Sequence, residues 1–210
     1  MRAKDYKKSA WSKMHGKWGV CALITFILSV IGFATGGLSA IGIGVLLLIF
    51  VEMPLEYSAS HVALSVCRGE KVEFGDAFAG FKIYWKALCL NLLMCIFIFL
   101  WSCLFIIPGI IKTFSYSMSN FILRDNPNMT ASEAITESRR MMKGNKWRLF
   151  CLCFSFIGWF ILSIFTCGIL LFWITPYMNA SIAEFYRSLK NENDTSVDTV
   201  ESAEVEDTKE

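Results

Sequence analysis

The sequence contains few charged residues and few of the residues that enzymes use at catalytic centres. Asp, Glu, Lys and Arg make up 18% of its 210 residues, whereas a soluble domain carries about 25%. It has only two histidines, His15 and His61, and it lacks the H-E-x-x-H, P-loop and G-x-S-x-G motifs. We therefore expect a protein that is not an enzyme and that has no catalytic residue, no metal site and no cofactor.

The spacing of the cysteines is not that of a disulfide framework or a zinc site. They are scattered through apolar segments, where cysteine behaves as a small hydrophobic residue. The sequence predicts that all eight are packing residues, and they are Cys21, Cys67, Cys89, Cys95, Cys103, Cys151, Cys153 and Cys167.

Long apolar runs, in contrast, fill most of the chain. Three stretches of 34–37 residues carry no charge apart from Lys112, and they cover Trp18–Val51, Ala87–Leu123 and Leu149–Ala183. A helix needs about 20 apolar residues to cross the roughly 30 Å of hydrocarbon in a bilayer. Each stretch is too long for one crossing and long enough for two short ones. The sequence thus predicts an all-α membrane protein with six transmembrane helices, arranged as three helical hairpins.

The positions of the 20 Lys and Arg residues predict the orientation of these hairpins. All except Lys112 lie before the first stretch, in the connections Cys67–Lys86 and Arg124–Arg148, or after the last stretch. Basic residues near spans stay on the cytoplasmic side of a membrane. We therefore expect a multi-pass protein of the cell membrane with both termini in the cytoplasm and with all three hairpins inserted in the same sense.

A short motif recurs three times and indicates an internal repeat. It is Tyr57–His61, then Tyr116–Asn120 and, more faintly, Tyr177–Ser181, each in the second helix of its hairpin. Each hairpin also begins with a tryptophan next to a lysine, in the pairs Lys17-Trp18, Trp85-Lys86 and Lys146-Trp147. The sequence predicts one polytopic helical domain over residues 1–190, with repeats of roughly 1–67, 68–126 and 127–190.

An amphipathic helix is predicted before each of those tryptophans, on the cytoplasmic face. The clearest begins at a capping box of Thr130 and Glu133 and ends near Gly144. Tryptophan, lysine and arginine suit the headgroup layer, so the predicted interfacial anchors are Trp18, Trp85, Trp147, Arg139, Arg140, Lys143 and Lys146. These helices either only anchor and orient the protein, or they also bind anionic lipid headgroups. Nucleic acid is not an expected partner, because it would leave the apolar helix faces without a role.

Several short motifs resemble one known family. Ile106–Lys112 followed by Tyr116–Met118 is similar to the signature of the bacterial integral membrane proteins catalogued as domain of unknown function number nine-seven-five. Further matching segments, in the same order as in that family, are Arg2–Lys4, Gly16–Trp18, Ser138-Arg139, Met142–Trp147 and Pro176-Tyr177. Over roughly residues 1–190, the resemblance implies a polytopic bacterial membrane protein without an assigned activity or catalytic residues.

Two glutamates and one lysine are the ionisable residues predicted near membrane depth. Glu52 and Glu56 are four residues apart and share a helix face, and aligning Tyr57 with Tyr116 puts Lys112 within about one turn of both in depth. A bare charge in lipid costs several kcal/mol, so we expect a glutamate to pair with Lys112 in a buried polar layer. The layer is either a neutralised pair that fixes helix packing or a proton or cation relay, unless the glutamates reach an interface or water.

The C-terminal segment 191–210 differs from the rest of the chain. It carries eight acidic residues against one lysine and has no aromatic residue. Such a composition cannot bury enough apolar surface to order the chain. The sequence therefore predicts a disordered acidic cytoplasmic tail.

The predicted function is a non-enzymatic role in organising or sensing the membrane. The expected partners are membrane lipids, including anionic ones, and a membrane protein partner or a second copy of this chain. The alternative is a subunit of a small-solute or ion transporter or channel that uses the layer of Glu52, Glu56 and Lys112. A transporter requires a polar cavity that reaches this layer, whereas a scaffold is packed dry there.

Overall fold

The computed structural model describes residues 3–14, 18–38, 48–104, 106–166 and 168–207. Within these ranges the chain forms helices and turns and no strand, which confirms the all-α prediction. The helices are α1 (Ala3–Met14), α2 (Trp18–Leu38), η2 (Leu48–Glu52), α4 (Met53–Arg68), η3 (Phe74–Phe78), α5 (Ala79–Lys82), α6 (Tyr84–Leu104), α7 (Ile106–Tyr116), α8 (Ser119–Asp125), α9 (Ala131–Met141), α10 (Lys146–Phe154), α11 (Ile157–Phe165) and α12 (Leu171–Asp207).

Within the described residues, two helical segments are long and apolar enough to cross a membrane. They are Tyr84–Cys103, in α6, and Lys146–Phe165, formed by α10 and α11. A bent pair, Lys4–Met14 with Trp18–Gly32, makes a third if its two helices, which meet at 102°, are one span. These segments indicate a membrane protein, but they do not confirm six spans. The helices in the place of the second span of the first two predicted hairpins are α4 and α7. They have only 16 and 11 residues.

The candidate spans turn apolar side chains outward. In α6 the side chain of Phe99 is 68% exposed, and in α11 that of Phe165 is 81% exposed. Large neighbouring side chains on both helices are exposed as well. A continuous apolar surface of this kind is unfavourable in water and suits contact with lipid.

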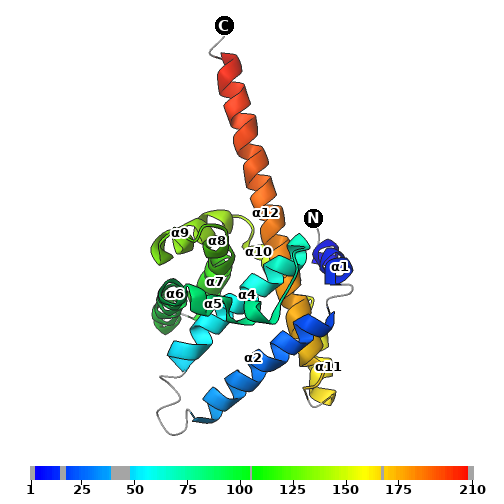
Figure 1. Ribbon diagram of the computed structural model, residues 1–210. Coiled ribbons are helices and arrows are strands. Elements are labelled where there is room, and N and C mark those ends of the chain that lie inside the picture. Colours follow the sequence, from blue (N-terminus) through cyan, green and yellow to red (C-terminus); the bar gives the residue numbers. More distant parts are fainter. Residues whose placement is uncertain (1–2, 15–17, 39–47, 105, 167, 208–210) are drawn as a thin grey trace.

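The core lies where α4, α8 and α12 meet, with α4 between α12 and the α6–α8 group (Figure 1). Phe121 of α8 stacks on Tyr186 of α12 at 5.4 Å between ring centroids. Helix α1 packs along α12, where Tyr6 meets Phe185 edge to face at 5.3 Å. Helices α4, α8 and α12 thus form the interior, while the candidate spans lie outside.

Two of the three predicted amphipathic helices form as expected. Helix α9 begins at the predicted capping box, where Thr130 Oγ1 accepts from the Glu133 amide and Glu133 Oε2 accepts from the Thr130 amide. Gly144 adopts a φ of 84° after its end. Helix α1 buries Tyr6 and Met14 and exposes its lysines Lys4 and Lys8. Lys17, predicted to lie at the first membrane entry, is outside the described residues.

The middle segment is broken into η3 and α5. The break brings the backbone at Gly80 against α4: its amide donates to Ser58 Oγ at 2.9 Å. A Cβ atom at Gly80 would lie only 2.0 Å from the carbonyl oxygen of Pro54. This close approach explains why position 80 is a glycine.

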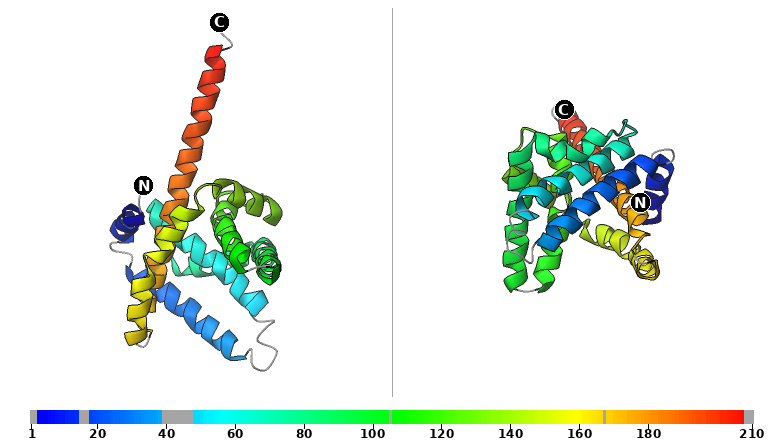
Figure 2. Two further views of the ribbon diagram at one scale, coloured as in Figure 1. Left: turned by 180° about the vertical axis from the view of Figure 1, so that it is seen from behind. Right: turned by 60° about the horizontal axis from the view of Figure 1, so that its bottom comes forward.

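The C-terminal segment continues α12. The helix runs to Asp207, so residues 191–207, which the sequence predicts to be part of a disordered acidic cytoplasmic tail, are helical in the structure. It extends beyond all other helices (Figures 1 and 2). The physical reason is that the tail adds turns to an existing helix and avoids the unfavourable nucleation step, and it contains neither glycine nor proline.

Candidate functional site

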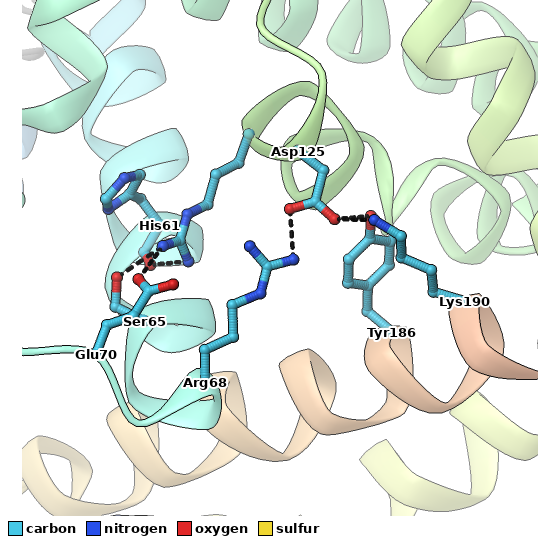
Figure 3. Close-up of polar contacts among 8 residues, drawn as sticks. His61, Ser65, Arg68, Glu70, Asp125, Tyr186 and Lys190 are labelled. Atoms are coloured by element: carbon cyan, nitrogen blue, oxygen red, sulfur yellow. Dashed lines mark hydrogen bonds and ion pairs between the residues drawn. The ribbon is translucent and has the colours of Figure 1, made fainter.

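A cluster of charged side chains joins α4, α8 and α12, and Figure 3 shows it. Asp125, the last residue of α8, accepts hydrogen bonds from Arg68 of α4 at 2.6 Å and from Lys190 of α12 at 2.7 Å. Tyr186 of α12 donates its hydroxyl to the same carboxylate at 3.0 Å. The Asp125 side chain is only 4% exposed, whereas the side chains of Arg68 and Lys190 are 31% and 44% exposed, so the carboxylate is buried beneath its partners.

Arg124, next to Asp125 in α8, makes a separate set of contacts with α4 and with Glu70. Its guanidinium donates to the carbonyl oxygen of His61 at 2.8 Å, to Ser65 Oγ at 2.9 Å and to Glu70 Oε2 at 2.7 Å. Two consecutive residues of α8 therefore hold both the end of α4 and the side of α12.

A second network ties α1 to α12. Glu184 of α12 accepts from Lys13 at 2.6 Å and from Ser9 at 3.1 Å, both on α1. Arg187, one turn further along α12, pairs with Glu184 at 3.1 Å and also donates to the carbonyl oxygen of Cys67 at 2.6 Å. The network joins the beginning of the chain to its last helix and to the end of α4.

The two buried carboxylates, Asp125 and Glu184, have lowered pKa values in spite of their burial. Burial raises the pKa of Asp125, but hydrogen bonds from Lys190, Arg68 and Tyr186 outweigh it and leave the pKa below its ordinary value. Burial also raises the pKa of Glu184, and hydrogen bonding to Lys13 again brings the pKa below its usual range. Because each charge is matched by a partner, the networks serve to hold helices together.

An acidic cavity of about 390 Å³ lies between α2, α4 and α12. Glu52 and Glu56 line it together with the hydroxyls of Thr25 and Ser29 and the side chain of Asn179. The remaining lining is mostly apolar. This cavity brings the two predicted glutamates of the polar layer together.

A basic cavity of about 350 Å³ lies between α7, α9 and α10. Five of its seven lining residues are cations, and the other two carry hydroxyl groups; they are Lys112, Arg139, Arg140, Lys143, Lys146, Ser115 and Thr136. Four of the five cations belong to the predicted interfacial anchors. The fifth, Lys112, lies with its ammonium group 4.4 Å from the centre of the Trp101 ring.

The structure therefore separates the three residues of the predicted polar layer. Glu52 and Glu56 line the acidic cavity, whereas Lys112 lines the basic one. Aligning the repeats gave Lys112 a similar depth to the glutamates, but equal depth does not put two helices on the same side of a bundle. The third helix that lines the acidic cavity is α12 and not α7.

The three predicted tryptophan anchors have two kinds of environment. Trp85 and Trp147 are 72% and 71% exposed, as expected of residues in a headgroup layer. Trp18 is half-buried and packs against Trp11 and Tyr177, with ring centroids 5.0 and 6.2 Å away. Trp18 thus contributes to packing between α1, α2 and α12.

The residues that hold the networks together are not among the predicted site residues. Arg124 and Asp125 begin the predicted connection Arg124–Arg148, and Glu184 comes just after the apolar stretch Leu149–Ala183. The available signal was their position at the end of long apolar runs, where a charge can turn back towards the core. Their partners come from distant parts of the chain and could not be identified.

The chain matches a known protein family. A family model described as "Protein of unknown function (DUF975)" matches residues 1–113 and 104–193. No curated protein and no solved structure matches the chain.

Proposed function

This chain belongs to the family described as "Protein of unknown function (DUF975)", and from that premise we propose a non-enzymatic integral membrane protein that organises or senses the membrane through contacts with lipids or a partner protein. The proposed topology has six spans in three same-sense repeats, with both termini in the cytoplasm. The family carries no assigned activity, so the proposal rests on the geometry of this chain.

The basic cavity is the observation that carries this proposal. It lies beside Trp147, whose exposed ring suits the headgroup layer, and at the first residue of the candidate span Lys146–Phe165. The headgroups of a lipid bilayer carry their phosphates at the depth where an apolar span ends. Positive charge at that depth therefore lies close to the phosphates. Lys112 shares this cavity with cations expected on the cytoplasmic side, which supports an orientation with every Lys and Arg on that side.

The experiment is a comparison of lipids that co-purify with the protein in mild detergent. Native mass spectrometry of the wild type is expected to find phospholipids enriched over the composition of the host membrane, with anionic species in excess. A variant with Arg139→Gln and Lys143→Gln should lose that excess. The matched control, Lys4→Gln with Lys8→Gln, removes two exposed charges from α1 and should retain it. Wild-type protein whose bound lipids mirror the host membrane would argue against the proposal.

The acidic cavity supports a second candidate, a small-solute or ion transporter or channel subunit. A cavity lined by two carboxylates between α2, α4 and α12 supports this alternative, because transport requires a polar chamber near membrane depth. The test measures uptake of cations and protons into proteoliposomes. The double variant Glu52→Gln, Glu56→Gln is expected to abolish a flux that the wild type supports, and equal flux in both proteins, or none in the wild type, counts against transport.

A further inference from the structure

We propose that the basic cavity binds the phosphate group of an anionic phospholipid, with the lipid chains lying along the exposed face of α10. This inference rests on the proposed function and deepens it, because it names the ligand class and the residues that bind it.

The clustering of cations in this cavity exceeds what helix dipoles explain. Arg139, Arg140 and Lys143 lie in and just after the last turn of α9, where the dipole favours positive charge. Lys146 is the first residue of α10, where the dipole opposes a cation. Lys112 comes from the interior of α7. Three helices therefore bring positive charges together, and at least one of them does so against its own dipole.

The positive charge of the cavity is mostly unmatched by carboxylates. Among the ion pairs of the described residues, Arg140 alone of the five cations has a partner, Glu137, at 2.7 Å. Lys112 rests on the Trp101 ring, which leaves its charge intact. Like charges that share a cavity repel one another, and a bound anion removes that repulsion. The arrangement thus favours an anionic ligand.

The donors of the cavity match a phosphate group. A guanidinium presents a planar fork of N–H donors, and lysine ammonium groups add point charges, so both bind phosphate oxygens by charge-assisted hydrogen bonds. Arg139 of α9, Lys143 of the turn that follows it and Lys146 of α10 supply such groups. The Ser115 and Thr136 hydroxyls already donate to the carbonyl oxygens of Ile111 and Ser132, so the cations must provide the binding.

The surroundings of the cavity identify a lipid as the source of the phosphate. Trp147 stacks on Phe150 at 5.1 Å, and Phe150 contacts Phe154 at 5.9 Å, so a strip of rings runs down α10 from the cavity. Trp147 and Phe154 are exposed, as is Ile111 of α7. A soluble phosphate ester has no use for this strip, whereas acyl chains cover it and remove apolar surface from water. A zwitterionic lipid brings its own cation into the cavity and is disfavoured there.

The test compares four probes on the purified protein in detergent, by native mass spectrometry and by thermal unfolding. The probes are a short-chain phosphatidylglycerol, phosphatidylcholine with the same chains, glycerol phosphate and inorganic phosphate. The wild type is expected to bind phosphatidylglycerol about tenfold more tightly than each other probe, from the attraction of clustered cations for an anionic lipid. Equal binding of phosphatidylcholine, or equal stabilisation by glycerol phosphate or inorganic phosphate, overturns the proposal.

Variants of the cavity residues test whether the lipid binds in the basic cavity. The triple variant Lys112→Gln, Arg139→Gln, Lys143→Gln is expected to lose the tenfold preference, while the control Lys4→Gln, Lys8→Gln, Lys71→Gln keeps it. If the triple variant does not fold, Lys143→Glu serves in its place, with Lys71→Glu as its control, because both positions are exposed. A cavity variant that binds phosphatidylglycerol like the wild type overturns this inference but leaves the proposed lipid function standing. A wild type without any preference for anionic lipid removes both.

Discussion

The hydroxyl of Ser138 on α9 donates to the carbonyl oxygen of Ser115 on α7 at 2.8 Å. The same oxygen of Ser138 accepts from the amide of Met118, at the break between α7 and α8. Ser138 is completely buried. The Ser138 side chain therefore provides a hydrogen-bond partner for the carbonyl of Ser115 and for the amide of Met118 at the break between α7 and α8.

Ser138→Ala is expected to destabilise the protein by about 1–3 kcal/mol, because it leaves a buried carbonyl and a buried amide without partners. Thermal unfolding in detergent measures the effect. Ser132→Ala, at an exposed position of the same helix, is the control and should change stability little. Equal unfolding temperatures for both variants would contradict the bridging role.

Gly80→Ala tests the close approach between α5 and α4. The added Cβ would meet the carbonyl oxygen of Pro54 at 2.0 Å, so the helices must move apart and the bond from the Gly80 amide to Ser58 weakens. We expect a loss of about 1–3 kcal/mol, as for overpacked cores. Gly75→Ala has open space around its Cβ and is the matched control. A Gly80→Ala protein as stable as the control would show that this contact is absent.

The lowered pKa of Asp125 predicts that the protein becomes less stable in acid. The Asp125 pKa is lowered in the folded protein, so the stabilising effect of its charge is fully present above the ordinary pKa of 3.8. As the pH falls below 3.8, the unfolded chain takes up the proton first, and stability declines until the pH passes the lower folded-state pKa.

Asp125→Asn should therefore be less stable than the wild type at pH 6, and the gap should narrow below pH 3.8. Unfolding midpoints in detergent between pH 6 and pH 3 check this expectation. The exposed Asp5→Asn provides the comparison. A gap of constant size over the whole range would refute the linkage between this carboxylate and folding.

Cysteine labelling at positions 112 and 143 tests the proposed topology. Because Lys112 lines the same cavity as Lys143, cysteines at the two positions are expected to react with a membrane-impermeant maleimide from the same side of the membrane. The background is a variant in which the native cysteines are replaced by alanine or serine. Labelling of the two positions from opposite sides would exclude the shared cavity in the membrane-embedded protein.

The helical class and the first and third amphipathic helices were predictable, since each depends on neighbours in sequence. The period of apolar residues and the capping box at Thr130 act within one or two turns, and α9 begins where these residues require. The family resemblance was likewise carried by short local motifs, and residues 1–113 and 104–193 match that family.

The predicted polar layer shows where local reasoning stopped. Glu52 and Glu56 share a cavity because Glu52 ends η2 and Glu56 lies in the first turn of α4, which follows directly. The neighbour of α4 at this cavity is α12, whereas Lys112 lines the cavity between α7, α9 and α10. Hydropathy and repeat alignment assign depth along the membrane normal. Neither of them predicts the order in which the helices are arranged around the bundle.

The sequence by itself determined that the chain is helical and apolar enough for lipid, because these properties follow from each segment's own composition. The tertiary structure alone decided which charges meet: Asp125 with Arg68 and Lys190, and Lys112 with the cations of α9. The physical reason is that a charge interacts strongly only with groups within a few ångströms of it, by attraction or by repulsion, and in a helical bundle those groups come from distant parts of the chain.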